Sequence, residues 1–344
     1  MKCWYVAATA DELDSSPVGR RILGVDIVLW RGASGRVTAF ENRCAHRAFP
    51  LSHSIIDGDQ LVCGYHGCTY DQDGTCVHIP SQERVPSGMS IRVFPVVEDP
   101  PFVWIWTGSP GAAATTPPPT VPWVREAGWE TFQRSWDVAA NYLMVHEHYL
   151  DFSYAPVLHA ADIPASIRSM PAFSEVEVTE TTVKYTRVLP PARPTDWEAE
   201  AGELDRDVDY RRTEIGTFAS PALHLQRWDV ETPAGETLTT TRIHAITPQD
   251  DNSTRVVMMS SRNYSLGRRA ATDRLRSFLT GVAQRDVAVL EMASAHSGYG
   301  RWQTGIEFQA DVAALRARRI VDAMLANEAG RIPGPQRHHA DATI

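Results

Sequence analysis

Residues 44–76 read CAHRAFPLSHSIIDGDQLVCGYHGCTYDQDGTC and contain two pairs of metal-ligand side chains. Cys44 and His46 form the first pair, and after sixteen intervening residues Cys63 and His66 form the second. One thiolate and one imidazole on each of two loops suit a [2Fe–2S] cluster in which one iron takes both sulfurs and the other takes both imidazoles. A Cys2His2 zinc site needs the same ligand types and is the alternative, although zinc fingers do not use this pairing and spacing. We therefore expect an iron–sulfur domain around these four residues.

The composition of the whole chain excludes several classes of protein. Its 344 residues, 43% of them hydrophobic, suffice for two domains with separate cores. Five cysteines, an odd number, indicate metal or redox use rather than a disulfide framework. The net charge of −9 argues against a nucleic-acid binder and is compatible with a redox partner that presents a basic patch. Because the chain has no apolar run of about 18 residues and no signal-like N-terminus, we expect no membrane span and a cytoplasmic location.

Short β-strands separated by turns are expected from residue 1 to residue 108. Residues 25–30 and 36–40 are rich in β-branched and apolar side chains, with glycines between them, which predicts a hairpin. Residues 101–106, PFVWIW, predict a last buried strand. The proline- and glycine-rich residues 109–122 predict a linker without a helix or a central strand.

Residues 123–344 predict a second, mixed domain. A helix is expected over residues 138–155, where Pro156 would end it. Alternating strands are expected between residues 174 and 264, and a long helical region between residues 272 and 325. The polar, proline-containing tail after residue 330 is expected to be loose.

The cluster segment resembles that of the Rieske-type non-haem iron oxygenases. Besides the four ligands, six residues stand on positions that match the family segment: Arg47, Leu51, Ser52, Tyr65, Gly67 and Gly74. Cys68 stands where the family usually has tryptophan, and we interpret it as a small residue packed beside the cluster. Within the family, the group typified by vanillate demethylases is the most similar.

The resemblance continues in residues 141–159, NYLMVHEHYLDFSYAPVLH. The family segment there contains an asparagine, an aspartate and two histidines. It implies that His159 is a ligand of a mononuclear iron and that Asp151 connects the cluster of one subunit to the iron of the next. Tyr154 then stands in place of the first ligand histidine, and His148 in place of the asparagine.

A distant carboxylate completes the iron site in the family, where two histidines and one carboxylate bind Fe(II) and leave positions open for O2. The resemblance puts Asp286 on that position, with Glu291 as the alternative. On one continuous helix, His148 and Tyr154 would share a broad face but lie about 120° apart. His146 would point elsewhere and is expected to be a surface or packed histidine.

Three interpretations of the second site stay open. In the first, His148 replaces the missing ligand and completes the set with His159 and Asp286. In the second, Tyr154 binds as a phenolate, a hard anion that favours ferric iron. In the third, the site binds no iron.

The resemblance also implies the fold and the function. The fold is α+β, with an N-terminal Rieske [2Fe–2S] antiparallel β domain followed by a helix-grip (START/Bet v 1-like) catalytic domain with a long C-terminal helix. The implied function is the terminal oxygenase of a multi-component monooxygenase that hydroxylates or O/N-demethylates a small, aromatic substrate with O2. Electrons from NAD(P)H would arrive through a separate reductase or ferredoxin, and the assembly would be a homotrimer without nucleic-acid or membrane partners. The alternative is a non-catalytic or electron-transfer Rieske subunit that lacks the mononuclear iron.

The substrate-binding residues are not predicted in detail. Arg227, Arg242 and Arg262 are candidate partners for a substrate carboxylate, with a surface or structural role as the simpler interpretation of each.

Overall fold

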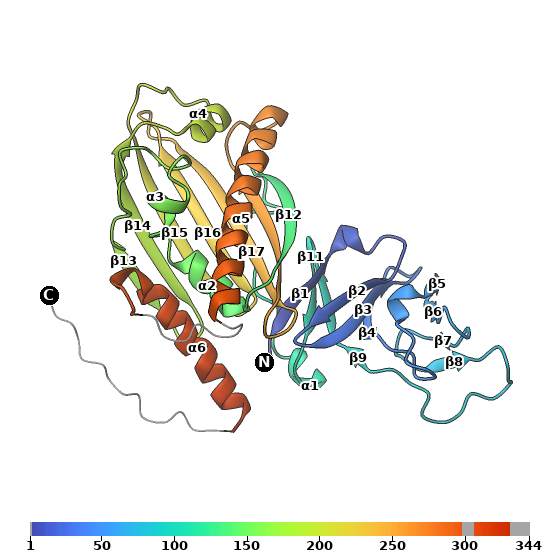
Figure 1. Cartoon of the computed structure of the whole chain (residues 1–344). Helices are drawn as coiled ribbons and strands as arrows, with labels where there is room; N and C mark the ends of the chain where they lie inside the picture. The colour runs from blue at the N-terminus through green and yellow to red at the C-terminus, as the bar shows by residue number, and fades with distance from the viewer. Residues whose placement is uncertain (1, 298–305, 331–344) are drawn as a thin grey trace.

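The structure, a computed structural model, describes residues 2–297 and 306–330. Within these residues, three small antiparallel sheets form an N-terminal part, and one seven-stranded antiparallel sheet with helices forms a C-terminal part (Figure 1). The predicted α+β class with two structural parts is confirmed.

The N-terminal sheets have the strand orders β1-β11-β10, β2-β3-β4-β9 and β5-β6-β7-β8. Their strands are β1 Trp4–Thr9, β2 Val18–Ile22, β3 Val25–Arg31, β4 Val37–Glu41, β5 Ile55–Asp57, β6 Gln60–Val62, β7 Thr69–Tyr70, β8 Cys76–His78, β9 Val93–Phe94, β10 Val96–Asp99 and β11 Phe102–Trp106. Two 3-10 turns, η1 Ala10–Glu12 and η2 Leu51–His53, lie among them. The predicted hairpin is confirmed as β3 and β4, and the predicted last strand is β11, whose five residues are all buried.

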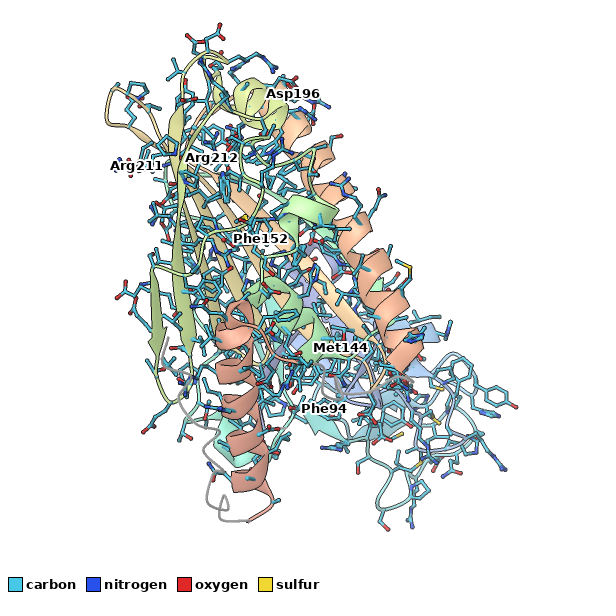
Figure 2. The ribbon with its side chains drawn as sticks, turned by 60° about the vertical axis from the view of Figure 1, so that its left-hand side comes forward. Phe94, Met144, Phe152, Asp196, Arg211 and Arg212 are labelled. Carbon is cyan, nitrogen blue, oxygen red and sulfur yellow. The ribbon has the colours of Figure 1, made fainter. Side chains whose placement is uncertain are left out.

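The C-terminal sheet has the order β12-β18-β17-β16-β15-β14-β13. Its strands are β12 Glu130–Val138, β13 Glu175–Val178, β14 Val183–Ala192, β15 Tyr210–Ser220, β16 Leu223–Glu231, β17 Thr237–Pro248 and β18 Thr254–Arg262. Side chains alternate between its two faces, so that Arg211 and Arg212 point to opposite sides, while Phe152 lies between the sheet and the long helix α5, Arg269–Ser297 (Figure 2). This enclosed space between the sheet and α5 contains the candidate site.

Helix α5 forms because apolar side chains recur every three or four residues along one stripe that faces the sheet. Leu275, Leu279, Val282 and Leu290 are buried on this stripe. Asp286 is buried on the same stripe, with 5% of its surface exposed. A carboxylate at a core position is costly unless partners satisfy it, so its position indicates a function.

The prediction of one helix over residues 138–155 is wrong in the extent of the helix. Helix α2, Tyr142–Leu150, begins at Asn141, whose side chain accepts a hydrogen bond from the Leu143 amide. It ends at Leu150 because Asp151 adopts an extended backbone with φ −113° and ψ 101°. A separate short helix α3, Ala155–Leu158, follows, and Pro156 lies in its first turn, where a missing N–H costs nothing. His148 and Tyr154 therefore do not share one helix.

The expectation that the linker holds no helix is also wrong. Residues Pro110–Ala113 form the short helix α1, because proline is favoured at a helix start and alanine continues a helix well. The predicted limits at residues 108 and 122 do not separate two hydrophobic cores. Tyr5 and Trp104 of the N-terminal sheet belong to the same buried cluster as Leu223 and Ile243 of the C-terminal sheet.

The predicted C-terminal helical region consists of α5, the 3-10 turn η3 Gln309–Asp311 and α6 Val312–Glu328. A further helix, α4 Asp196–Gly202, packs against α5. The predicted loose tail, residues 331–344, lies outside the described residues. In the part of the chain that the structure describes, no helix is long and apolar enough to cross a membrane.

Candidate active site

The four predicted cluster ligands lie on two loops with the same local geometry. The Ala48 amide donates to the Cys44 carbonyl at 3.0 Å, and the Gly67 amide donates to the Cys63 carbonyl at 3.0 Å. Each hydrogen bond closes a tight turn with the cysteine at its base. Gly67 has a φ of +72°, and a Cβ at this position would lie 2.8 Å from the Pro80 side chain, so the second turn requires glycine.

The two kinds of ligand differ in exposure. Cys44 and Cys63 are each 2% exposed, inside an apolar cluster of the N-terminal part. His46 and His66 are exposed, and their ring centroids lie 4.6 Å apart. The thiols therefore lie inside and the imidazoles face solvent, which suits a cluster with one iron held by sulfur and the other by histidine at the surface.

Tyr70 contacts the sulfur side of this site. Its hydroxyl lies 3.2 Å from Cys44 Sγ and accepts a hydrogen bond from the Ala45 amide at 3.2 Å. Burial raises the pKa of Cys68 to about 11, so this neighbouring thiol stays protonated and packs as a small apolar residue. Tyr70 was not identified from the sequence, because its proximity to Cys44 depends on the pairing of β6 with β7.

The second candidate site joins three segments that lie far apart in the sequence. His148 comes from the last turn of α2, His159 directly follows α3, and Asp286 comes from the buried face of α5. His159 Nε2 lies 2.7 Å from Asp286 Oδ1 and donates to it. His148 Nε2 lies 3.1 Å from the same oxygen.

These three side chains fit an iron ion. Two ligands at about 2.1 Å from one ion and at right angles to it are about 3 Å apart, which is close to both N–O distances. His148 Nε2 is aimed at the carboxylate but is not aligned for a hydrogen bond, so it is a buried nitrogen without a hydrogen-bond partner among the described residues. Within residues 2–297 and 306–330, no three histidine, cysteine, aspartate or glutamate side chains are already spaced around a position for a metal ion. At this site the two imidazoles lie in direct contact with the Asp286 carboxylate. An ion would replace these contacts.

The protonation of Asp286 agrees with this assignment. Burial alone would raise the pKa of its carboxyl group, but the two imidazoles act against burial and hold that pKa well below its usual range. The carboxylate is therefore anionic, the form that binds a metal.

Tyr154 lies against the face of His148 rather than pointing its hydroxyl at the carboxylate. The two rings are stacked, with centroids 4.1 Å apart and an angle of 14° between their planes. Burial raises the pKa of Tyr154 well above its usual range, and the charge of Asp286 raises it further. A neutral phenol stacked on an imidazole suits a packing role better than a phenolate ligand.

Asp162 and Arg285 contact the far nitrogen of His159. Arg285 Nε donates to His159 Nδ1 at 3.2 Å, and Asp162 Oδ2 lies 3.8 Å from the same atom. Arg285 also forms an ion pair with Asp162. Histidines that bind metals usually donate their other N–H to a carboxylate. Here Nδ1 accepts from Arg285, and Asp162 is the carboxylate that an N–H on Nδ1 would face if Nε2 bound a metal. Sequence reasoning missed both roles, although Asp162 lies only three residues after His159 and Arg285 directly precedes Asp286.

The remaining candidates lie outside the triad formed by His148, His159 and Asp286. The Asp151 carboxylate accepts a hydrogen bond from the Ser153 amide at 2.8 Å and lines a groove with His148 and Tyr154. Glu291 accepts from the Ala139 amide at 2.9 Å. His146 is buried, with Nε2 3.0 Å from the Pro221 carbonyl oxygen, and burial lowers its pKa to about 4.

A cavity adjoins the triad on the side of the sheet. Its lining is mostly aromatic and aliphatic, with a few polar side chains: Phe152, His159, Asp162, Ile163, Trp197, Trp228, Thr240, Arg242, Phe278, Leu279 and Val282. Apolar walls with few polar groups are typical of small-molecule sites.

Tyr149, His224 and His244 form a stacked group beside the triad that the sequence did not reveal. The ring of Tyr149 lies 4.1 Å from His244 and 5.5 Å from His224. Both histidines are buried, and His224 has no hydrogen-bond partner for either ring nitrogen within the described residues. Only the pairing of β16 with β17 brings these two histidines together.

Two family models match the chain. The model described as vanillate O-demethylase oxygenase C-terminal domain matches residues 138–327, and the model described as Rieske [2Fe-2S] domain matches residues 3–95. The first of these alone covers more than half of the chain.

Known proteins match over almost the full length. The vanillate O-demethylase oxygenase subunit of a Pseudomonas species is 28% identical over 338 residues, which cover 94% of each chain. The oxygenase component of dicamba O-demethylase from Stenotrophomonas maltophilia is 27% identical and covers 93% of this chain and 96% of its own. A crystal structure of dicamba monooxygenase bound to 3,6-dichlorosalicylic acid superposes with a TM-score of 0.87 at 27% identity, covering 96% of this chain and 98% of that one. Another, which contains non-haem iron and dicamba, has a TM-score of 0.79.

Proposed function

The chain belongs to the vanillate O-demethylase oxygenase family of Rieske oxygenases, and from this premise we propose that His148, His159 and Asp286 hold its mononuclear iron. The chain is the oxygenase component of a Rieske monooxygenase, and the comparisons support this function over that of a non-catalytic subunit. Its cofactors are a Rieske [2Fe–2S] cluster and mononuclear Fe(II), and electrons from NAD(P)H reach it through partner components. Held by His148, His159 and Asp286, Fe(II) would supply the O2 activation that attack on a C–H bond needs.

One observation carries the proposed ligand set. His148 Nε2, within 3.1 Å of Asp286 Oδ1 and without a hydrogen-bond partner in the described residues, offers the lone pair that Tyr154 does not. Two neutral imidazoles and one carboxylate are the donor set that leaves positions open for O2 on Fe(II). Tyr154 packs on the ring of His148 and limits its rotation.

The other residues of the site have separate roles in this proposal. Arg285, which is paired with Asp162, orients His159 through Nδ1, and α5 excludes water from the triad by covering the sheet. Asp151 lies at the groove with His148 and Tyr154 and is the proposed entry point for electrons. Cys44, His46, Cys63 and His66 hold the cluster.

The proposed assembly is a homotrimer in which the cluster of one subunit serves the iron of the next. Strands β5 to β8, which carry the loop with Cys63 and His66, lie at the end of the N-terminal part that is remote from the C-terminal sheet (Figure 1). His46 and His66 are exposed there, as are Tyr65 (61%) and Ile55 (66%). An exposed apolar and aromatic surface around the electron outlet supports docking against another chain.

The proposed substrate is a small aromatic molecule, hydroxylated on carbon or O/N-demethylated. Hydroxylation of a methoxy group leaves a hemiacetal, which breaks down to a phenol and formaldehyde. The aromatic side chains in the cavity wall, Phe152, Trp197, Trp228 and Phe278, support an aromatic substrate.

The iron content of the full chain after anaerobic reconstitution with Fe(II) tests the ligand set. We expect about three irons per chain in the wild type and about two in His148→Ala, because the cluster alone contributes two. The matched control is His146→Ala, which removes a buried histidine two positions earlier on the same helix. This variant should retain about three irons per chain. Mononuclear iron that survives His148→Ala would overturn the ligand set. About two irons in the wild-type chain would mean that its second site does not hold iron at all.

A further inference from the structure

Two tryptophans line the cavity beside the triad, and they are held in different ways. Trp197 belongs to α4 and Trp228 to β16, and both side chains are buried. The indole N–H of Trp228 donates to a buried carboxylate, whereas that of Trp197 donates to a backbone carbonyl group in a turn. This difference indicates one fixed wall and one movable wall.

Trp228 is the fixed wall. Its Nε1 donates to Glu198 Oε1 at 3.1 Å. Arg212 Nε and Nη2 donate to the two oxygens of the same carboxylate, at 2.7 and 2.8 Å. Glu198 is 3% exposed and Arg212 0%, so water does not compete for these bonds. Because hydrogen bonds to a charged group are about twice as strong as those between neutral groups, the indole of Trp228 is firmly held.

Trp197 is held more weakly. Its Nε1 donates to the Asp162 carbonyl oxygen at 3.0 Å, a bond between two neutral groups. Its ring stacks on Phe278 of α5, with centroids 4.3 Å apart and an angle of 6° between the planes. Phe278 and Asp162 are half-buried, whereas Phe152 and Trp228 of the same cavity are buried. Trp197, Phe278 and Asp162 therefore form the wall of the cavity that is nearest to solvent.

The helix that carries Trp197 is itself anchored. Helix α4 lies beside the first turns of α5, at the end of the C-terminal sheet away from the N-terminal part (Figure 1). Glu198, the next residue of α4, is fixed to Arg212 of β15 by the buried bonds described above. Glu200 pairs with Arg274 of α5 at 2.5 Å. The movable unit is therefore the Trp197 side chain and not the helix.

We propose that Trp197 is the gate of the substrate cavity. Rotation of its side chain away from Phe278 and Asp162 opens a path between α4 and α5, along which an aromatic molecule enters and leaves, while Trp228 stays in place. A closed gate over a bound molecule keeps water from the reacting centre, as closing lids do in many enzymes. The inference rests on the proposed function, because the gate serves that same site.

The test measures how a neutral aromatic probe, 4-fluoroanisole, exchanges with the iron-loaded full chain. Fluorine NMR line shapes give its entry and exit rates, and the ratio of the two rates gives the affinity, without a tryptophan reporter. Trp197→Phe keeps a ring for stacking on Phe278 but lacks the N–H that holds the gate closed. We expect both rates to rise by the same factor, roughly 2- to 10-fold as for the loss of one neutral hydrogen bond, with the affinity unchanged within about twofold.

Phe278→Leu opens the gate from the other side. It removes the stacking partner of Trp197 but keeps an apolar side chain in the wall. Both rates should again rise together, by roughly 2- to 10-fold, as for the loss of one aromatic pair.

Trp228→Phe is the matched control, because it also replaces an indole of the cavity wall and removes its N–H. It should leave the entry rate unchanged, and any loss of affinity should appear in the exit rate alone. The inference is wrong if Trp197→Phe leaves both rates unchanged, if it alters the exit rate alone, or if Trp228→Phe raises the entry rate as much.

The same measurement separates a failure of the gate from a failure of the proposed function. Rates that do not change in a protein that binds the probe contradict the gate alone. If neither the wild type nor Trp197→Phe takes up the probe, the cavity does not admit aromatic molecules, and both the gate and the proposed aromatic substrate are wrong.

Discussion

The two proposed metal-ligand sets of this chain are built in opposite ways. At the N-terminal site, two hydrogen-bonded turns hold buried thiols below exposed imidazoles, all within one short stretch of sequence. At the C-terminal site, three buried side chains from α2, α5 and the segment after α3 meet under a helix. The first arrangement exposes one edge of a cluster to a partner, and the second keeps water away from a reactive centre. Electron transfer tolerates solvent at the ligand edge, whereas O2 activation requires a closed site.

The difference extends to what supports the ligands. The turns around Cys44 and Cys63 are fixed by their own backbone hydrogen bonds. His159 and Asp286, which are 127 residues apart in the sequence, instead depend on each other and on the packing of α5. Damage at one site should therefore leave the other intact, and substitutions can separate the two.

The largest effect is expected for Cys63→Ser. A hydroxyl group does not replace a thiolate ligand, so the cluster should be lost, and iron should fall from about three to about one per chain. The visible absorption of the cluster and reductase-dependent turnover should disappear together. Cys76→Ser, which alters another buried cysteine of the same apolar cluster, is the control and should keep both. A cluster spectrum that persists in Cys63→Ser would refute the ligand assignment.

Asp286→Asn should remove the second site alone. The neutral amide offers the iron no anionic ligand, so iron should fall to about two per chain while the cluster spectrum stays unchanged. Glu291→Gln, on the same helix, should keep about three irons, because Glu291 caps the Ala139 amide instead of facing the triad. The independence of the two sites would be disproved if the cluster were lost with Asp286.

Tyr70→Phe should shift the potential of the cluster without loss of iron. The variant lacks the hydroxyl group 3.2 Å from Cys44 Sγ, and hydrogen bonds to the sulfurs stabilise the reduced, more negative state. A net hydrogen-bond energy of about 0.5–1.5 kcal/mol predicts a potential lower by roughly 20–60 mV, measured by a redox titration. Tyr65→Phe, which removes an exposed hydroxyl beside His66, should leave the potential unchanged. An unchanged potential in Tyr70→Phe would mean that this contact does not tune the cluster.

The smallest effect is expected for Tyr154→Phe. Because Tyr154 packs on His148 as a neutral phenol, phenylalanine should preserve both the stacking and an iron content of about three per chain. Loss of mononuclear iron, or of a ferric phenolate absorption band, would favour the phenolate interpretation instead.

The sequence predicted these two sites to different degrees. The cluster ligands lie in two turns, so their spacing alone indicated the kind of site. His159 and Asp286 were predicted through family resemblance, and spacing alone would not have joined positions so far apart. The position of Asp286 on an otherwise apolar helical stripe was the one local signal.

The local geometry around His148 was predicted incorrectly. A continuous helix would have put His148 and Tyr154 about 120° apart, but α2 ends at Leu150, and the extended Asp151 turns the chain so that the two rings stack. Neither a glycine nor a proline stands at residues 149–152, so the sequence gives no clear signal that the helix stops there.

Among the described residues Arg242 forms no ion pair, and the sequence could not show this because it depends on the strand register. Arg242 lies opposite Gln226 on β16 and Ser260 on β18, so neither neighbouring strand gives it an acidic partner. The sequence alone offered three arginines of equal standing.

Strands β1 and β11 share one hydrophobic core with the C-terminal sheet, and this core fixes where the iron–sulfur cluster lies relative to that sheet. Thr247 of β17 donates to the Val6 carbonyl of β1 at 2.7 Å, and the surrounding side chains of both parts are buried together. Separating the two parts would expose this apolar surface to water. The N-terminal part with its iron–sulfur cluster therefore does not move relative to the C-terminal part on a flexible linker of residues 109–122. In the proposed homotrimer, the distance from the cluster to the iron of the next chain would be set by how whole chains dock, and the rate of electron delivery would be a property of the assembly.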